Sequence, residues 1–207
     1  HDNLCLAGGV VLNCVANGRL KREGPFDNLY IQGAAGDDGG ALGAALYTAN
    51  TLRGHDRTHV NTMYWGPSYT NEEIMAVLDE DGVDYEHRDD VVQHTAARVA
   101  DGEIVGWFQG RMEFGPRALG NRSIIADPRV EESKDVVNEK IKFRENWRPF
   151  APSMLEEDAD RYMKDIETSP FMIRAYDVIS EDIPAVTHVD NTARPQTVTQ
   201  EQNPRYY

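Results

Sequence analysis

The start of the sequence alternates between short apolar segments and glycine-rich turns, and this alternation is the strongest constraint on the fold. Residues 3–7 are apolar and lead into Gly8 and Gly9, a pattern typical of a strand that enters a tight turn. Apolar residues then recur at a helical spacing from Val10 to Leu20, and Leu29 to Gln32 repeats the strand pattern. Such strand–turn–helix units indicate an α/β layer.

The rest of the chain continues this mixed pattern after an interruption. Residues 54–70 are polar and lack a sustained period, so we interpret them as a linker and domain boundary. Asn71 to Asp79 is predicted to be a helix, with Thr70 or Asn71 as its N-cap. The other expected elements are a glycine loop over 36–40, helices over 41–52, 91–101 and 156–166, a strand over 104–109, and an extended or partly mobile segment over 180–207.

Composition describes an acidic chain that is able to fold. The 207 residues carry a net charge of -14, and 40% of them are hydrophobic, which excludes a disordered chain. No apolar run reaches the roughly 20 residues of a membrane span, and no secretory signal is recognisable. Cys5 and Cys14 are expected to be reduced and buried, as in a cytoplasmic protein. The acidity fits either a surface adapted to high salt concentration or an ordinary acidic protein. It argues against binding of nucleic acid by the surface as a whole.

Two glycine-rich turns are candidate ligand sites. Gly8 and Gly9 separate a strand from a helix, where a ligand can approach the backbone and a helix N-terminus favours anions. Asp37 and Asp38 lie in a glycine loop at a helix start, where carboxylates hold a divalent cation or cap the helix. Alone, the glycines are better explained by the turn, and the carboxylates fit either role. The histidines form no ligand-spaced pair.

The segment from Glu113 to Ser123 concentrates positive charge against the acidic background. Its glycines and proline fix the backbone, so Arg117 and Arg122 are presented at little entropic cost, and Ser123 adds a hydroxyl donor. Guanidinium groups suit phosphate oxygens, so an anionic ligand is favoured. The alternative is that these arginines pair with nearby carboxylates such as Glu113 or Asp127.

Residues 142–151 form a second basic segment. Lys142 and Arg144 alternate, so an extended backbone would place both side chains on one face. Trp147 and the Pro-Phe pair that follows Arg148 would anchor the segment in the core. Arg148 itself either joins a ligand site or forms a structural salt bridge. Together the two basic segments predict that cations from separate loops converge on one phosphorylated ligand.

These segments together resemble the carbamoyltransferase family that includes the nodulation-type and antibiotic O-carbamoyltransferases. The combination is specific, covers the chain nearly end to end and is weakest in the linker. It consists of Leu6-Ala-Gly-Gly-Val-Val-Leu-Asn-Cys14, Ala35-Gly-Asp-Asp-Gly-Gly-Ala-Leu-Gly-Ala44, residues 113–129 and 141–153, Ser169-Pro-Phe-Met172, Val186-Thr-His-Val-Asp190 and Arg194-Pro-Gln-Thr-Val198.

The resemblance implies two α/β domains. Residues 1–53 would be the C-terminal tail of an actin/Hsp70-like ATPase domain, residues 54–69 a linker, and residues 70–207 an incomplete YrdC-like domain. The implied chemistry is ATP-dependent: carbamoyl phosphate and ATP form a carbamoyl-adenylate in the YrdC-like domain. The carbamoyl group then passes to an acceptor hydroxyl at a metal-assisted site in the ATPase-like domain.

The resemblance also assigns roles by position. In the first site it implies nucleotide contacts from Gly8, Gly9 and Asn13, and it makes Asp37 a ligand of Fe²⁺ or a similar divalent metal. Carbamoyl phosphate and the phosphates of ATP with Mg²⁺ would be bound in the second site by Arg117, Lys142 and Arg144 as catalytic cations, with Arg122, Ser123 and Arg148. Adenylation builds negative charge on phosphorus, and fixed cations in a dry pocket stabilise it.

The implied partners are carbamoyl phosphate and a hydroxyl-bearing small molecule, with no nucleic acid and no membrane. The acceptor and the oligomeric state stay open, a homodimer included. The family's histidine metal ligands would precede residue 1, and the end of the YrdC-like domain is also missing, so we expect a fragment that is inactive alone as a transferase. The alternatives are a tRNA threonylcarbamoyladenosine-type synthase and a non-catalytic nucleotide- or phosphate-binding module.

Overall fold

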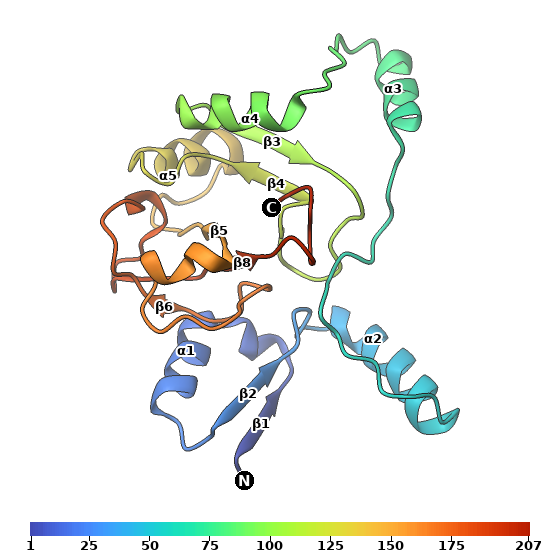
Figure 1. The fold of residues 1–207 in the computed structure, drawn as a ribbon, viewed down its shortest axis with the longest axis vertical. Coiled ribbons are helices and arrows are strands. Elements are labelled where there is room, and N and C mark those ends of the chain that lie inside the picture. The colour runs from blue at the N-terminus through green and yellow to red at the C-terminus, as the bar shows by residue number, and fades with distance from the viewer.

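A parallel β–α–β unit opens the chain in the computed structural model, which describes residues 1–207 (Figure 1). β1 (Asn3–Leu6) and β2 (Asn28–Ile31) confirm the two predicted strands, and they pair in parallel. The predicted helix begins later than expected, because η1 (Gly9–Leu12) is a separate 3₁₀ turn before α1 (Cys14–Glu23). Asn13 separates the two, and its side chain accepts a hydrogen bond of 3.1 Å from Ala16 N as the N-cap of α1.

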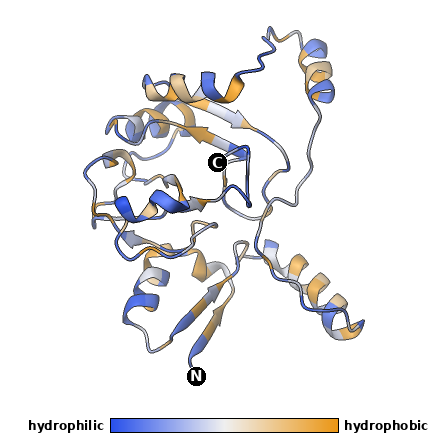
Figure 2. Ribbon diagram, in the orientation of Figure 1, coloured by the Kyte–Doolittle hydropathy of each residue, from blue (hydrophilic) through white to orange (hydrophobic).

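The second helical segment starts earlier than the sequence indicated. α2 (Asp38–Leu46) begins inside the predicted glycine loop and continues as the π-helical η2 (Tyr47–Leu52). None of its residues is buried. In Figure 2 much of the α2 ribbon has the colour of hydrophobic residues, and α2 projects away from the rest of the molecule.

The predicted linker contains no helix or strand, and the helix after it is capped as expected. α3 (Asn71–Glu80) has Thr70 as its N-cap. Thr70 Oγ1 accepts from Glu73 N at 3.2 Å, and Glu73 Oε2 accepts from Thr70 N at 2.8 Å, which completes a capping box. α4 (Val91–Ala100) confirms the next predicted helix.

The C-terminal half consists of short strands with α4 and α5 on one side. β3 (Val105–Phe108) pairs antiparallel with β4 (Arg122–Ile125), and α4 lies across them (Figure 1). Next in the chain come α5 (Ser133–Val136), η3 (Val137–Lys142), β5 (Ser153–Leu155), η4 (Glu156–Arg161), β6 (Tyr176–Asp177), η5 (Pro184–Val186), β7 (Thr192–Ala193) and β8 (Gln196–Val198). β5 pairs in parallel with β8, and β6 pairs antiparallel with β7. The whole is mixed α/β, with four two-stranded sheets.

Two sequence expectations for this half need refinement. The helix predicted over 156–166 is the shorter 3₁₀ element η4. The segment from 180 to 207 is extended only in β7 and β8, and the 3₁₀ element η5 and turns make up much of the rest. Gln196 and Thr197 are almost completely buried, at 2% and 1% exposure, so this part of the chain belongs to the interior.

The first 35 residues pack directly against the C-terminal half. Asn17 Nδ2 donates to Ile173 O at 2.8 Å, and Ala175 N donates to Cys14 O at 3.0 Å. Two hydrophobic clusters also combine residues from both ends of the chain. They consist of Ile31, Ala35 and Ile173, and of Ala34, Met63, Leu119 and Met172. The Gly8–Asn13 segment is thereby fixed beside the basic loops.

The expectation of two buried cysteines is wrong. Both thiols are free, but Cys5 is exposed and Cys14 is only half-buried. Cys5 occupies a position of β1 where exposed and half-buried residues alternate, and its face of the strand is uncovered. None of the helices combines the length and the apolar character that crossing a bilayer requires.

Gly18 provides a test of the contact between α1 and the C-terminal half. A Cβ at this position would lie 2.3 Å from the carbonyl oxygen of Ala175, so Gly18→Ala should force the two segments apart. We expect the free energy of unfolding to fall by about 1–3 kcal/mol, as for other overpacked sites. Urea unfolding monitored by circular dichroism measures this change.

Gly43→Ala in α2 is the matched control for Gly18→Ala. A Cβ at Gly43 meets no atom within 4 Å, so this substitution should leave stability unchanged or raise it by up to about 1 kcal/mol. Equal effects of the two substitutions would contradict the close packing of α1 on Ala175.

Candidate anion-binding site

Glu113 organises the loop that carries Arg117. Its Oε1 atom accepts hydrogen bonds from the backbone N–H groups of Leu119 at 2.6 Å, Asn121 at 3.0 Å and Arg122 at 3.3 Å. Glu113 forms no ion pair, and these three backbone donors are the hydrogen-bond partners of its carboxylate. Glu113 therefore shapes the loop and does not neutralise the Arg117 guanidinium, so this part of the sequence-based alternative is wrong.

Two glycines allow the loop to turn tightly. Gly115 has a φ of 111°, and a Cβ there would lie 3.0 Å from Ala34 Cβ. Gly120 has a φ of 101°, and a Cβ there would lie 2.3 Å from the ring of Tyr206. Both positions combine a left-handed backbone with close approach, which only glycine tolerates.

Three buried side-chain amides hydrogen-bond to one another beneath the loop that carries Arg117 and stabilise it. Gln109 Nε2 donates to Asn121 Oδ1 at 2.9 Å and to Asn203 Oδ1 at 3.0 Å. Asn203 Nδ2 donates to Asn121 Oδ1 at 2.8 Å. All three residues are at least 94% buried. A connected buried network of this kind holds the backbone in one arrangement.

Arg117 is half-buried and has no carboxylate partner. Its NH2 atom donates to Leu12 O at 3.0 Å, and its buried Nε has no hydrogen-bond acceptor. Burial lowers the pKa of the guanidinium. The nearby acid Asp127 pairs with Arg129 at 2.5 Å and is not available to Arg117. Arg117 therefore links the second predicted site to the Gly8–Asn13 segment and keeps donor capacity free for a ligand.

Arg194 lies beside Arg117 and was not assigned a role from the sequence. Its Nε atom is also buried without an acceptor. Burial lowers the pKa of Arg194, and the positive charges of Arg117 and Arg144 lower it further, whereas Cys14 opposes the shift. The sequence did contain a signal, because Arg194 opens one of the segments that carried the family resemblance. Three guanidinium groups without acidic partners favour an anion between them.

Arg144 joins this group, but through a different backbone geometry than predicted. η3 runs to Lys142, and Phe143 has a left-handed φ of 48°, so residues 142–144 are not extended. The expectation that Lys142 and Arg144 share one strand face is therefore wrong. Arg144 Nε donates to Asn138 Oδ1 at 2.7 Å, and its guanidinium carbon lies 4.9 Å from the centre of the Phe150 ring. Lys142 is exposed and forms no ion pair.

The remaining predicted cations are less closely associated with this group. Arg148 Nε pairs with Glu145 Oε2 at 3.1 Å, which confirms the salt-bridge alternative for this residue. The guanidinium carbon of Arg122 lies 5.1 Å from the centre of the Phe108 ring on the exposed side of β4. Ser123 Oγ accepts a hydrogen bond from Gly120 N at 3.0 Å and so stabilises the loop. Trp147 is 73% exposed, so its predicted role as a core anchor is wrong.

The residues of the first predicted site have mainly structural partners. Gly8 N donates to Ala35 O at 2.7 Å, Gly8 has a φ of 104°, and Asn13 caps α1. Gly9 has open space around its Cα. Asp37 is exposed, and no group of three His, Cys, Asp or Glu side chains could hold a metal. The role of Asp37 as a metal ligand therefore stays a prediction.

His188 borders the arginine group. Thr192 Oγ1 donates to Asp190 Oδ1 at 2.7 Å and lies 3.1 Å from His188 Nδ1. Burial lowers the pKa of His188, and the charge of Arg194 lowers it further, whereas Asp190 and the backbone of Phe150 raise it. At neutral pH the imidazole is therefore uncharged and adds no further positive charge beside Arg194.

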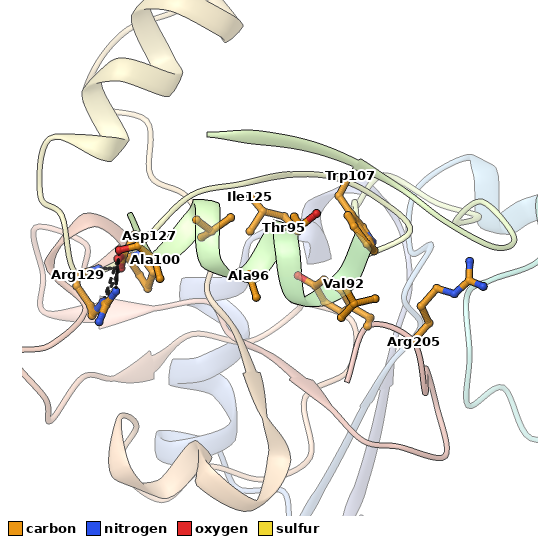
Figure 3. Close-up of a pocket in the computed structure, with 12 residues that line it drawn as sticks. Val92, Thr95, Ala96, Ala100, Trp107, Ile125, Asp127, Arg129 and Arg205 are labelled. Carbon is orange, nitrogen blue, oxygen red and sulfur yellow. Dashed lines mark hydrogen bonds and ion pairs between the residues drawn. The ribbon is translucent and has the colours of Figure 1, made fainter. Parts of the chain in front are cut away.

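A pocket of about 340 Å³ lies apart from these cations, between α4, β3, β4 and the end of the chain (Figure 3). Its walls are mostly apolar and include Val92, Ala96 and Trp107. None of the predicted site residues lines it. Its charged lining residues are Arg205 and the ion-paired Asp127 and Arg129. The chemistry of the arginine group, rather than the volume of this pocket, defines the candidate site.

Comparison with known proteins finds two family models that match the N-terminal and the C-terminal part of the chain. The family model described as "Carbamoyltransferase C-terminus" matches residues 96–207, which contain Arg117, Arg144 and Arg194. The model described as "Carbamoyltransferase N-terminus" matches residues 1–46. The chain belongs to the carbamoyltransferase family. The resemblance seen in the sequence is thus confirmed.

Individual carbamoyltransferase relatives are similar over almost all of the chain. It is 49% identical to the protein sll1178 of Synechocystis sp. over 100% of its length and 39% of that protein. It is 45% identical to nodulation protein NolO of Bradyrhizobium diazoefficiens over 99% of its length and 39% of NolO. It is 34% identical to the 3'-hydroxymethylcephem-O-carbamoyltransferase of Streptomyces clavuligerus, again over 99% of its length and 38% of the relative. The chain thus spans about two fifths of these relatives.

The role of Glu113 can be tested by substitution. Glu113→Ala removes the acceptor of three backbone N–H groups, so we expect the free energy of unfolding to fall by about 3 kcal/mol. Glu113→Gln should cost less, because one carbonyl oxygen remains. Chemical denaturation measures both changes. The exposed Glu132, which makes no ion pair, provides the control, and a Glu113→Ala variant as stable as Glu132→Ala would contradict the proposed role.

The lowered pKa of His188 predicts a pH dependence of stability. The pKa of a histidine in the unfolded chain is about 6.5, whereas the pKa of His188 in the folded protein is lower. Between these two values the unfolded state binds more protons, so the contribution of His188 makes stability fall as the pH drops below about 6.5. NMR titration of the His188 ring should show the lowered midpoint.

His188→Gln should flatten the pH dependence of stability below neutrality, whereas substitution of the exposed linker residue His55 should not. A His188 midpoint at or above the ordinary value would contradict the structure.

Proposed function

We propose that this chain is part of an ATP-dependent O-carbamoyltransferase. Residues 70–207 would cleave carbamoyl phosphate with water to carbamate and inorganic phosphate, and a carbamate oxygen would attack the α-phosphorus of ATP to give carbamoyl-adenylate and pyrophosphate. The carbamoyl group would then pass to an acceptor hydroxyl, with release of AMP and of the hydroxyl proton. Family membership and a relative named as an O-carbamoyltransferase support this proposal. We also propose that residues 70–207 correspond to a YrdC-like domain and residues 1–53 to the end of an ATPase-like domain.

The observation that carries the proposal is the pairing of two half-buried arginines without a carboxylate. Arg117 and Arg194 each have a buried Nε with no acceptor, and the charge of each lies within reach of the other. Like charges in a partly desolvated place are unfavourable unless an anion neutralises them. A phosphate group provides the geometry that guanidinium groups bind best.

The arginine group suggests how the chain would act on carbamoyl phosphate. Arg117 and Arg194 would hold the phosphate oxygens, and Arg144, fixed by Asn138, would stand beside them. Lys142, at the exposed end of η3, would contact the phosphates of ATP and Mg²⁺. When the α-phosphorus is attacked, negative charge increases on its oxygens. Cations held in place beforehand stabilise that charge without reorganisation.

The remaining residues of the two predicted sites are also proposed to contact ligands. Arg122, Ser123 and Arg148 are placed around the ATP phosphates, and Gly8, Gly9 and Asn13 at a nucleotide in the ATPase-like domain. Asp37 would contribute one ligand to an Fe²⁺-like metal there, and other donors would have to complete the set. The metal would serve as a Lewis acid for transfer to the hydroxyl. The substrates proposed are carbamoyl phosphate and a small hydroxyl compound.

The decisive experiment is an ATP–pyrophosphate exchange assay on the complete gene product. Carbamoyl phosphate should stimulate exchange in the wild type. Arg117→Ala, Arg194→Ala and Lys142→Ala should each reduce the stimulated rate by about 10²–10³-fold, the usual loss when one preorganised transition-state donor is removed. Radiolabelled pyrophosphate incorporated into ATP provides the measurement.

A matched control for these substitutions is Arg53→Ala, because Arg53 is exposed at the C-terminal end of η2 and forms no ion pair. It should retain wild-type exchange. Absence of carbamoyl-phosphate-dependent exchange in a folded wild-type protein would rule out the adenylating activity. Full activity of Arg117→Ala and Arg194→Ala would rule out the arginine group as its site.

A further inference from the structure

Two aromatic side chains protrude into solvent from the loop that follows η3. Phe143 is 83% exposed and Trp147 is 73% exposed, although the surrounding residues are charged or polar. Large aromatic side chains gain most when they are buried, so two on one short loop indicate a surface that receives a ligand. The anion chemistry described above does not use either ring.

The loop is firmly held, so the exposure of the rings does not come from a loose backbone. Asn138 is completely buried, at 0% exposure, and binds the loop at both ends. Arg144 N donates to Asn138 O at 3.0 Å, and Arg144 Nε donates to Asn138 Oδ1 at 2.7 Å. Asn138 Nδ2 donates to Arg148 O at 2.9 Å. Rings presented by such a loop lose little freedom when a ligand stacks on them.

The backbone conformation of Phe143 also supports a ligand-binding role for this loop. Its φ of 48° lies in the left-handed region, which is costly for a bulky side chain. The conformation ends η3 and presents the Phe143 ring to solvent between Lys142 and Arg144. Unfavourable backbone conformations of this kind concentrate at ligand-binding sites.

The charges around the rings specify the chemistry of the ligand. Lys142, Arg144 and Arg148 alternate with the aromatic residues, and the guanidinium carbon of Arg148 lies 5.7 Å from the centre of the Trp147 ring. A ligand that suits both features has a flat, apolar ring joined to a strongly anionic tail. A purine nucleoside triphosphate has this structure, because its base stacks on aromatic faces and its phosphates bind cations.

We propose that Phe143 and Trp147 form a stacking platform for the purine base of a nucleoside triphosphate whose phosphates bind Lys142 and the arginine group. This inference rests on the proposed use of ATP and adds to it the residues that recognise the base. Arg148 lies against Trp147 and holds Glu145, so it supports the platform from the side. The platform explains why an arginine with its own salt-bridge partner belongs to the site.

The test compares ATP with inorganic tripolyphosphate, which carries the same kind of anionic tail but no base. The complete gene product is titrated with each ligand in the presence of Mg²⁺ by calorimetry. Wild type should bind ATP at least about tenfold more tightly than tripolyphosphate, the lower end of what stacking on an aromatic side chain provides. Trp147→Ala and Phe143→Ala should remove most of this advantage and leave tripolyphosphate binding unchanged.

Two variants serve as controls for the platform. Trp147→Phe keeps an aromatic face and should retain most of the preference for ATP. Tyr47→Ala removes another exposed aromatic ring, from η2, and should change neither affinity. Tryptophan emission should also respond to ATP but not to tripolyphosphate, and Trp147→Phe should abolish that response.

The outcomes separate this inference from the proposed function. If wild type binds neither ligand, the phosphate site itself is wrong. If wild type binds both equally, or if Trp147→Ala weakens both to the same extent, the phosphate site stands and the platform is overturned. Tighter binding of single-stranded oligoadenylate than of ATP would also overturn it, because the rings would then serve RNA.

Discussion

The proximity of the Arg117 and Arg194 guanidinium groups is the constraint on which the site depends. Neither has a carboxylate partner, and burial and mutual repulsion both act against their positive charge. Such an arrangement persists only when the surrounding structure fixes both side chains. For Arg117 that support comes from Glu113, the Leu12 carbonyl and the buried amides of Gln109, Asn121 and Asn203.

The same arrangement joins the two ends of the sequence. Arg117 reaches the carbonyl group of Leu12, and the first turn of α1 hydrogen-bonds to the segment around Ala175. Gly115 approaches Ala34 closely enough that no other residue would fit there. The glycine-rich turn of the N-terminal part therefore contributes to the shape of the anion site. The contact with Arg117 is made by Leu12, in the 3₁₀ turn that follows Gly8 and Gly9.

The sequence predicted what depends on local patterns. The strand–turn–helix order, the capping box at Thr70 and the concentration of cations near Arg117 all follow from residue spacing and turn chemistry. It failed where geometry depends on distant contacts. The alternation of Lys142 and Arg144 indicated a strand, but Asn138, buried beneath the loop, stabilises a helical end with a left-handed residue. Arg194 follows a polar turn and gave no local signal of its approach to Arg117.

The exposure of α2 has a different consequence for the molecule. A helix without a single buried residue gains little from tertiary packing, so its own hydrogen bonds provide most of what maintains it beyond its first turn. Its amide protons should then exchange through local fraying at a free-energy cost far below that of opening the buried segment around Gln196 and Thr197. Different parts of this chain would thus unfold with different free energies, and a single melting temperature would describe only the interior.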